Sequence, residues 1–505
     1  VAAALFAVHP VHVEAVGNVV GQSELWAACG ILAAVTAFVH WRRSAVARAS
    51  WGRRQTLDGV GETTPLVQRL ATSLGQELGA ENLGGVRHQL VLVALVIGAC
   101  LAKEHAVVTP ALLVLAEVFL VDDPRPWRER CRALRPCALS LSLAVVSYVV
   151  VRAHVIGSWA GDRPNVVLEH LSAAARRWTM LGLVSEWTRL LVWPWRLVVE
   201  YAPRDIAIHE HFESSLIPSA VLLALILTLV VISVRRRALA GFALLWIAVT
   251  LLLVSNLVVP TGILLAERTL FLPSVGAALL AGDAVTRLAA HFGTAPVSSG
   301  ATRARGRHLA VAAGIGILLV LGAWRSAHRQ LVWRSNATVF AQAPLDAPLS
   351  YRAHDVFAGL LFDRGDKIGG EREARIALAL YPHDPVLYRD LAQEYMRAGM
   401  CTPAIPLLRR SIEEPASVET DAHLLLAECL LAEHDPSSAR VEVLRGVALG
   451  RYAYYGAGYH RLLMAIDSAT RGPQRLQGSV AGARATAGGA VPASSATPLS
   501  LHPAR

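Results

Sequence analysis

The chain has 505 residues and a formal net charge of +10, and 54% of its residues are hydrophobic. That hydrophobic share exceeds the value of ordinary soluble domains, so the composition excludes a simple soluble enzyme and favours an integral membrane protein. The basic residues are never combined with an aromatic binding surface, so nucleic acid is not an expected partner. None of the six cysteines forms a C-x-x-C pair, and neither a disulfide framework nor a zinc site is predicted.

Eight strongly apolar stretches follow one another along the first two thirds of the chain. They cover residues 25–41, 89–102, 106–121, 137–151, 216–234, 239–259, 270–288 and 308–324. A helix that crosses a bilayer needs roughly 20 mostly apolar residues, so each stretch is a candidate membrane span. Residues 1–8 look like the end of another span, and because the chain opens with Val1 inside an apolar run, we expect further spans to precede it. The prediction is a membrane domain over residues 1–334 with about eight or nine spans.

Four arginine clusters indicate the topology of these spans. They are centred on Arg42, Arg128, Arg236 and Arg305. If each span crosses once, all four clusters fall on one side, which the arginine enrichment assigns to the cytoplasm. The loops that carry His9, Lys103 and Glu267 then lie outside, together with everything after residue 324. Glu117, near the inner end of a span, is expected to extend its carboxylate to the membrane surface.

The stretch 180–195 is apolar but does not fit this alternation. Glu186, Arg189 and Pro194 interrupt it, and a full crossing would place every later arginine cluster on the opposite side. We therefore expect an interfacial helix whose tryptophans, Trp187 and Trp193 among them, lie at the depth of the lipid headgroups.

Residues 351–452 repeat with a period near 34, which is the spacing of tetratricopeptide helix pairs. The middle unit is the clearest, with motif residues Tyr388, Leu391, Ala392, Tyr395, Gly399, Ala404 and Leu408. We expect about three units after a linker at 335–350, then a C-terminal extension at 453–473 and a disordered tail at 474–505. The predicted fold class is all-α: a polytopic transmembrane helix bundle followed by a tetratricopeptide-repeat α-solenoid.

Three motifs on the outer side carry a family resemblance. They are LFAVHPVHVEAVGNVVGQSELWAA at residues 5–28, KEHAVVTPALLVLAE at 103–117 and AERTLFLPSVGAALL at 266–280. In this order, and followed by repeats, they resemble the signatures of the transmembrane and tetratricopeptide-repeat family. Members of that family resemble C-type glycosyltransferases.

The resemblance implies a multispan enzyme that uses a polyprenyl-phosphate sugar donor, and animal relatives are implicated in protein O-mannosylation. It also implies an acidic pair in a first outer loop, which would precede this chain. Sugar transfer to a hydroxyl needs a carboxylate that accepts the hydroxyl proton. It also needs cations that hold the developing phosphate charge.

The motif residues supply candidates for both tasks. The candidate catalytic carboxylates are Glu14 and Glu24, which flank the start of a span. The candidates for binding the donor phosphate are Lys103, Glu104, Glu267 and Arg268, because ammonium and guanidinium groups suit phosphate. The alternatives are a Lys–Glu pair that only reaches the interface and a Glu–Arg pair that only joins two helices.

Two further sets of residues have candidate roles. His9 and His12 share one face of a helical turn, and with Glu14 they could hold a divalent cation. The alternative is that both histidines cap the helix end and form local hydrogen bonds. In the repeats, Tyr388 and Tyr395 are candidates for binding the acceptor in a concave groove.

The predicted function is therefore a membrane glycosyltransferase that moves a sugar from a polyprenyl-phosphate donor to a protein or glycan acceptor on the outer face. The rival prediction is a non-catalytic, membrane-anchored repeat scaffold for protein–protein interaction. A transporter is disfavoured because no matching pair of broken helices occurs in two halves of the chain. The expected partners are the lipid-linked sugar, the acceptor and membrane lipid. Arginine-, alanine- and glycine-rich usage favours a bacterial inner membrane with periplasmic repeats.

Overall fold

The computed structural model describes residues 1–58, 80–156, 168, 171–202, 206–258, 261, 263–293, 301–414, 421–449 and 458–470. Every helix or strand element assigned within these ranges is helical, which confirms the predicted all-α class. The chain divides into two compact units, Val1–Leu380 and Tyr381–Arg505. The predicted disordered tail at 474–505 lies outside the described residues.

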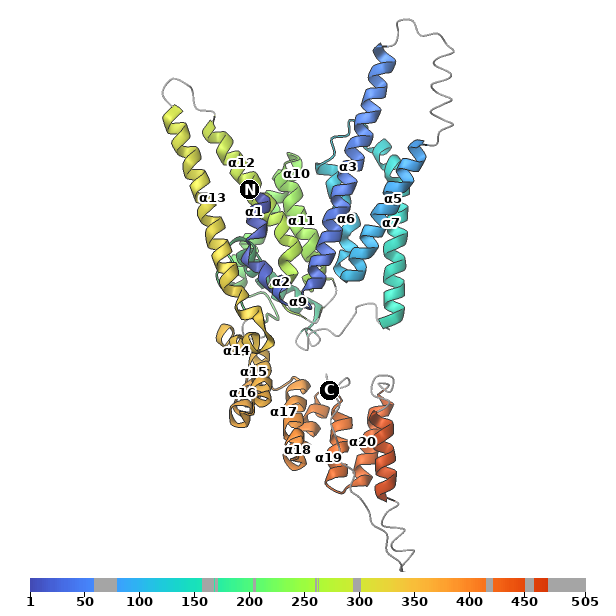
Figure 1. Cartoon of the computed structure of the whole chain (residues 1–505), viewed down its shortest axis with the longest axis vertical. Helices are drawn as coiled ribbons and strands as arrows, with labels where there is room; N and C mark the ends of the chain where they lie inside the picture. The colour runs from blue at the N-terminus through green and yellow to red at the C-terminus, as the bar shows by residue number, and fades with distance from the viewer. Residues whose placement is uncertain are drawn as a thin grey trace, which may run out of the picture. The chain divides into compact units, whose positions relative to one another are not determined.

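Six helices of the described ranges are long and apolar enough to cross a membrane, and the chain is a multi-pass membrane protein. They are α3 (Gln22–Asp58), α5 (Ala80–Ala102), α7 (Trp127–Ile156), α10 (Ile217–Arg235), α12 (Phe271–Gly293) and α13 (Ala301–Gln330). Two other predicted spans form shorter helices, α6 (Thr109–Phe119) of 11 residues and α11 (Leu239–Val254) of 16 residues. At a rise of 1.5 Å per residue they are about 16 and 24 Å long. Both lie among the longer helices (Figure 1).

The core of the bundle is built from apolar residues on α3, α5, α6 and α11, among them Ile31, Leu92, Leu112 and Trp246, all of which are fully buried. Small residues allow some of these helices to approach closely. A Cβ atom added at Gly276 of α12 would lie 2.6 Å from the carbonyl oxygen of Ala243 in α11. Any larger residue at position 276 would therefore push α12 away from α11.

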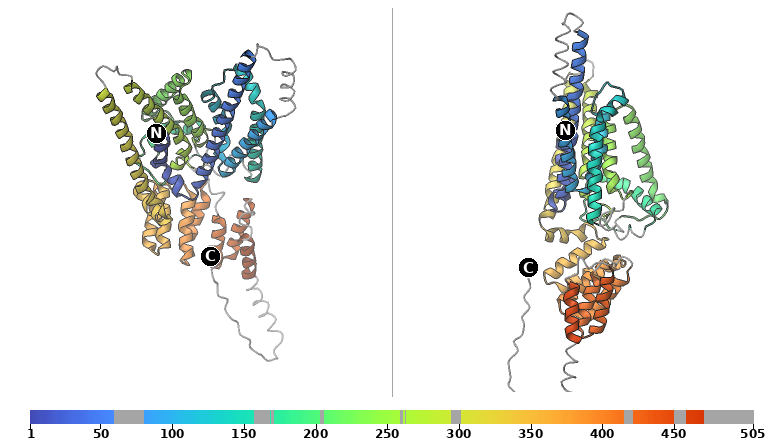
Figure 2. Two further views of the ribbon diagram at one scale, coloured as in Figure 1. Left: turned by 45° about the horizontal axis from the view of Figure 1, so that its top comes forward. Right: turned by 90° about the vertical axis from the view of Figure 1, so that its right-hand side faces the viewer.

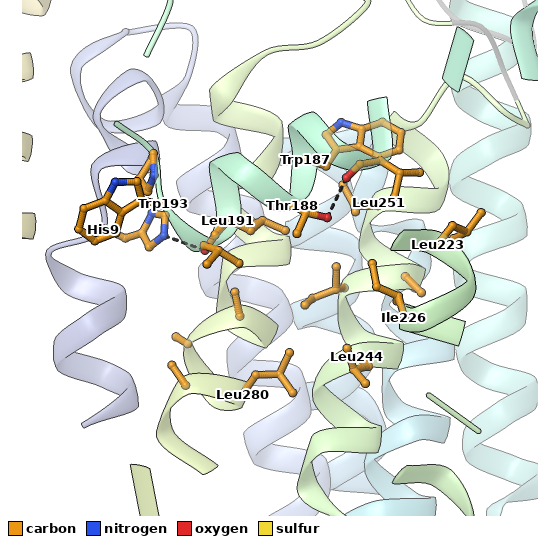
Figure 3. Close-up of a pocket in the computed structure, with 18 of the residues that line it drawn as sticks. His9, Trp187, Thr188, Leu191, Trp193, Leu223, Ile226, Leu244, Leu251 and Leu280 are labelled. Carbon is orange, nitrogen blue, oxygen red and sulfur yellow. Dashed lines mark hydrogen bonds between the residues drawn. The ribbon is translucent and has the colours of Figure 1, made fainter. Parts of the chain in front are cut away.

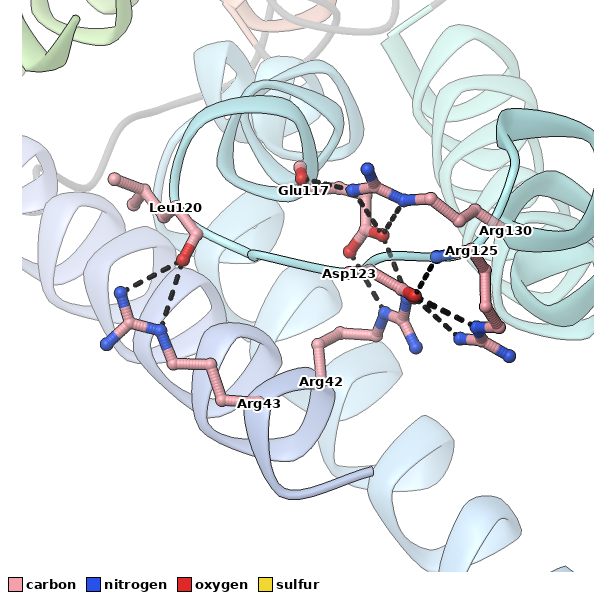
Figure 4. A network of polar contacts seen from close by, with 7 residues as sticks. All are labelled: Arg42, Arg43, Glu117, Leu120, Asp123, Arg125 and Arg130. Atoms are coloured by element: carbon pink, nitrogen blue, oxygen red, sulfur yellow. Dashed lines mark hydrogen bonds and ion pairs between the residues drawn. The ribbon is translucent and has the colours of Figure 1, made fainter. Parts of the chain in front are cut away.

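A buried ionic network joins α3, α6 and the start of α7 at the end of the bundle that carries the arginine clusters (Figure 4). The Glu117 carboxylate, 1% exposed, accepts hydrogen bonds of 2.8–3.0 Å from the guanidinium groups of Arg42 and Arg130. Arg42 also donates to Asp123 at 2.8 Å. Hydrogen bonds from Arg125 hold the pKa of Asp123 below its ordinary range. The expectation that Glu117 reaches the membrane surface is therefore wrong, because two arginines satisfy its charge inside the bundle.

The interrupted apolar stretch forms α9 (Ala173–Val192), which is not among the six candidate spans. Trp193 and Trp195, just beyond its C-terminal end, are more than half exposed. Trp187 was expected at headgroup depth, but it packs in a buried cluster with Leu183 and Leu190. One face of α9 is therefore part of the protein core.

The segment predicted as a linker at 335–350 is largely helical. Helix α14 (Asn336–Asp346) begins with a capping box formed by Ser335 and Thr338. It is followed by the helix pair α15 (Tyr351–Asp363) and α16 (Lys367–Leu380), which belongs to the first compact unit. The Arg329 guanidinium of α13 pairs with Asp346 at 2.6 Å, which ties α14 to the last membrane helix.

The second unit contains the helix pairs α17 (Pro385–Arg397) with α18 (Cys401–Glu413) and α19 (Ala422–Ala432) with α20 (Pro436–Ala448), and residues 458–470 are also helical. Figures 1 and 2 show these helices side by side. The turns that join α15 to α16, α17 to α18 and α19 to α20 each contain one residue with positive φ: Gly365, Gly399 and His434. Their separations of 34 and 35 residues reproduce the period seen in the sequence.

Cys401 and Cys429 form a disulfide between α18 and α19, although no disulfide was predicted. Their Cα atoms are 5.1 Å apart, which is within the normal range for a disulfide. A separation of 28 residues gives no local motif. The pairing arises only because consecutive helix pairs stack, so a sequence motif could not reveal it.

Candidate functional site

The three motifs that carry the family resemblance come together at the end of the bundle away from the Glu117 network. Short helices hold them there: η1 (Pro10–His12) and α2 (Val13–Gly17), η2 (Glu104–Val108), and η4 (Glu267–Leu270). Helix α2 contacts η4, and η2 contacts both α3 and α5. Residues more than 250 positions apart in the sequence are thereby neighbours.

The first ionic pair joins Glu14 of α2 to Arg268 of η4. The Arg268 guanidinium donates to one carboxylate oxygen, and the Arg268 backbone N–H donates to the other oxygen at 2.9 Å. The Glu14 side chain is 2% exposed, whereas that of Arg268 is 22% exposed. Both carboxylate oxygens are thus engaged, and the arginine keeps an accessible edge. The sequence left open a Glu267–Arg268 pair that joins two helices. In the structure Arg268 pairs with Glu14 and not with Glu267.

The second ionic group surrounds Glu24 in the first turn of α3. The Lys103 ammonium lies 3.6 Å from one Glu24 oxygen, and His105 Nδ1 lies 3.2 Å from the other. The Glu24 side chain is 5% exposed and that of Lys103 is 29% exposed. Burial lowers the pKa of His105 to about 4, so its ring is neutral at ordinary pH. Arg268 is within electrostatic range of Glu24, which brings the two ionic groups into one region.

The two ionic groups share the same arrangement. A buried carboxylate, Glu14 or Glu24, holds a cation that remains partly accessible, Arg268 or Lys103. Pairing fixes the cations in place, and their accessible sides can still meet an anionic ligand. Chemically, the arrangement suits binding of a phosphate group. Glu104, which follows Lys103 in the chain, is exposed.

Glu267 does not line this accessible region, although it was a candidate for binding phosphate. It is fully buried, and its Oε1 atom accepts the backbone N–H of Val198 at 2.6 Å and the Tyr201 hydroxyl at 3.1 Å. Burial and the nearby Glu267 carboxylate raise the pKa of Tyr201, which keeps the phenol protonated as the donor. Glu267 therefore anchors the segment after α9 to η4.

His9 and His12 hydrogen-bond to one neighbouring residue and to two distant segments of the chain. His9 Nδ1 accepts the backbone N–H of Val11, and its Nε2 lies 3.1 Å from the Leu191 carbonyl oxygen. His12 Nε2 lies 2.7 Å from Ser274 Oγ, and burial lowers the pKa of His12 to about 3. Within the described residues, no three histidine, cysteine or acidic residues are grouped as metal ligands would be. His9 therefore caps the start of η1, as the alternative expected, whereas the side chain of His12 caps no helix and contacts Ser274 of α12 instead.

Sequence reasoning missed one carboxylate at this end of the bundle, Glu200. It lies in the segment after α9, and its Oε1 atom is 3.8 Å from Arg352 Nη1 of α15. Glu14 and Arg268 are within electrostatic range of it. The residue belongs to none of the three motifs, and the only sequence signal was an acidic residue in a segment that begins with tryptophans.

A large apolar groove opens beside the His9 loop (Figure 3). It has a volume of about 1130 Å³ and is lined by residues of α9, α10, α11, α12 and α13. Leu191, Leu223, Leu251 and Leu280 are among the lining residues, and His9 is at one edge. The groove therefore runs from the membrane helices towards the loop that carries Glu14.

In the repeats, Tyr388 and Tyr395 are both partly buried in the first helix of the middle pair. The Tyr388 hydroxyl donates to the Pro382 carbonyl oxygen at 3.0 Å, and Tyr395 packs against the core of the second unit. Both rings take part in holding the repeat together, so their role in acceptor binding stays a prediction.

No protein-family model matches the chain. Curated relatives do match it. The human protein O-mannosyl-transferase TMTC1 is 23% identical over 76% of this chain and 42% of its own length. The human protein O-mannosyl-transferase TMTC4 is 26% identical over 74% of this chain and 48% of its own length. The mouse TMTC1 protein is 25% identical over 49% of this chain and 26% of its own length.

The chain thus spans between about a quarter and a half of the length of these relatives. Among solved structures, yeast Tom70 is 12% identical, with coverage of 79% of this chain and 89% of that one, but the TM-score is only 0.26. The sequence relatives agree with the motifs described above. The chain resembles the transmembrane and tetratricopeptide-repeat family of protein O-mannosyl-transferases.

Proposed function

We propose that this protein is a membrane glycosyltransferase that moves a sugar from a polyprenyl-phosphate donor to a hydroxyl of a protein or glycan acceptor. The observation that carries the proposal is the pairing of Arg268 with Glu14 and of Lys103 with Glu24 at one end of the bundle. The names of the relatives support sugar transfer to protein hydroxyls.

In this reaction the acceptor oxygen attacks the anomeric carbon of the sugar, the bond from that carbon to the phosphate oxygen breaks, and the proton of the acceptor hydroxyl is released to solvent. Negative charge accumulates on the departing lipid phosphate. Arg268 and Lys103 would stabilise this charge, because fixed cations in a site of low polarity act more strongly than cations in water. Glu14 and Glu24 would hold these two cations in place. The sequence suggested instead that these carboxylates accept the proton of the acceptor hydroxyl. Glu14 is poorly suited to that role, because both of its oxygens already accept hydrogen bonds.

The apolar groove suits the lipid chain of such a donor. Its lining is mainly leucine, alanine, tryptophan and valine, and His9 and Arg325 are among its few polar residues. A polyprenyl chain seated there would have its phosphate near the His9 loop and therefore towards Arg268. The repeats would hold the acceptor, and the arginine clusters would place this end of the bundle on the outer face. The expected location is an inner membrane with periplasmic repeats.

The test is sugar transfer by the full-length protein in lipid nanodiscs, with a polyprenyl-phosphate sugar and serine- or threonine-containing peptides. Arg268→Ala and Lys103→Ala should each lower kcat/KM by about 100-fold, as removal of one charge-stabilising donor commonly does. Arg287→Ala and Lys367→Ala are matched controls, because both side chains are exposed and lie outside the ionic region. Each control should keep the wild-type rate.

Two outcomes would contradict the proposal. If wild-type protein transfers no sugar from any lipid-phosphate donor, the rival function as a membrane-anchored repeat scaffold replaces it. If transfer occurs but both cation variants keep the wild-type rate, the donor phosphate binds elsewhere.

A further inference from the structure

The position of Glu200 is fixed by its neighbours in the chain. Val198 and Tyr201, on either side of it, both donate hydrogen bonds to the buried Glu267 carboxylate. Val198 and Tyr201 are themselves buried, at 4% and 6% exposure. The segment is thereby attached to η4 at two points, and the side chain of Glu200 is directed instead towards Arg352 of α15.

Glu200 differs from the other carboxylates of the ionic region in how firmly it is held. Glu14 and Glu267 accept short hydrogen bonds and are almost fully enclosed, and so is Glu24. The Glu200 side chain is 38% exposed, and the 3.8 Å separation from Arg352 is too long for a hydrogen bond. An exposed ion pair of this kind contributes little to stability. Glu200 can therefore exchange Arg352 for a ligand at little cost.

The surroundings of Glu200 place it between two regions of the proposed reaction. On one side lies η4, because Tyr201, the next residue after Glu200, is bonded to Glu267, and Glu267 precedes Arg268, a candidate for holding the donor phosphate. On the other side lies α15, the first helix of the repeat region. An acceptor that reaches the donor along α15 would pass this carboxylate.

We propose that Glu200 binds the acceptor by accepting a hydrogen bond from its reacting hydroxyl, beside the cations that hold the donor phosphate. This inference rests on the proposed function and extends it to acceptor recognition. The phosphate group of the donor is excluded as the ligand of Glu200, because a carboxylate repels a phosphate. A hydroxyl is a suitable ligand, because an ionised carboxylate is an acceptor without a proton of its own and forms strong hydrogen bonds with O–H groups.

The charge state of Glu200 gives this contact a pH dependence. Burial by the surrounding groups raises the pKa of Glu200, the nearby Glu14 carboxylate raises it too, and Arg352 and Arg268 lower it. The ionised form, which binds the hydroxyl best, is present above this raised pKa and is lost as the pH falls through it. Acceptor binding should therefore weaken on the acidic side. Arg352→Ala removes one group that lowers the pKa, so it should move this weakening to higher pH.

The experiment measures initial rates with the full-length protein while either the donor or the peptide acceptor is varied. Glu200→Ala should raise the acceptor KM by about 10-fold or more and leave the donor KM within about twofold, which corresponds to the loss of one charge-assisted hydrogen bond. Glu200→Gln keeps an oxygen acceptor and should lie between wild type and Glu200→Ala, without the acidic loss. Glu210→Gln is the control, since this glutamate is exposed in the same connecting segment.

The outcomes separate this inference from the proposed function. If wild-type protein shows no transfer, the proposed function fails and the inference fails with it. If wild-type protein is active and Glu200→Ala keeps the wild-type acceptor KM, only the inference fails. It fails equally if the donor KM rises as much as the acceptor KM, or if Arg352→Ala matches Glu200→Ala without moving the acidic limb. In the last case the pair is only a structural contact between the segment and α15.

Discussion

Replacing Glu117 by alanine should destabilise the membrane bundle more than any exposed substitution. The carboxylate accepts two hydrogen bonds from Arg42 and two from Arg130, and both guanidinium groups are at least 95% buried. Without it, Arg42 still has Asp123, but Arg130 loses its carboxylate partner and keeps the backbone carbonyl oxygen of residue 117 and the Trp127 ring. Removing one partner of a buried ion pair commonly costs about 3–5 kcal/mol.

The measurement is thermal unfolding in detergent, followed by tryptophan fluorescence at one fixed scan rate, because unfolding of such proteins is commonly irreversible. A cost of 3–5 kcal/mol corresponds to a fall in Tm of about 6–20 °C, at about 2–4 °C per kcal/mol. The matched control is Glu129→Ala, which removes an exposed carboxylate next to Arg130. It should change Tm by no more than about 2 °C, in line with surface substitutions.

The double variant Glu117→Leu with Arg130→Leu sharpens this test. It removes both charges together, and buried ion pairs replaced by apolar residues of similar size often show no loss of stability. It should therefore be more stable than Glu117→Leu alone. A Tm for Glu117→Ala within about 2 °C of wild type would refute the reasoning, because the two arginines would then need no buried carboxylate.

Four shorter predictions concern the other parts of the chain. Cys401→Ser should lower the unfolding free energy of the repeat unit by about 3–4 kcal/mol, because the disulfide no longer closes a 28-residue loop in the unfolded chain. Denaturant titrations without reductant measure this, and an unchanged midpoint contradicts it. His434→Gly should raise stability by about 1 kcal/mol in the same titrations, since φ is +63° there and glycine tolerates it; a loss of stability contradicts this. Glu14→Gln should lower sugar transfer by about 10-fold or more, because Arg268 loses its charged partner; a wild-type rate makes the pair dispensable. Reporter fusions at Ala238 and Ser350 should report opposite compartments, and one shared compartment refutes the topology.

Periodicity and charge made most of the fold predictable. The apolar stretches and arginine clusters predicted the helices of the bundle, because helix length and loop charge are read locally along the chain. The period near 34 predicted the helix pairs for the same reason. What local patterns could not predict was the length of a helix: α6 and α11 are shorter than a bilayer crossing because turns at their ends take up part of the apolar stretch.

The candidate site was only partly predictable. The motifs marked Glu14, Lys103 and Arg268, yet the sequence could not show which carboxylate pairs with which cation. Glu267 is adjacent to Arg268 in the chain, but the helical turn directs the two side chains apart, and Glu14 forms the pair instead. The sequence signal at Glu200 was too weak to mark it, because its significance depends on neighbours from α2, η4 and α15. The disulfide was missed because it depends on the stacking of two repeats.

The close contact between Gly276 and Ala243 has a mechanical consequence for the apolar groove. Helices α11 and α12 cannot slide past one another without a clash, so they form its rigid wall. The other walls include α10 and α13. Only 6% of the most apolar stretch of α10, and 0% of that of α13, is buried within the protein. Few protein contacts resist the movement of these two helices, and the surrounding lipid must supply most of the resistance. The width of the groove should then follow the lateral pressure of the bilayer, so that membrane composition sets how readily an occupant enters and leaves.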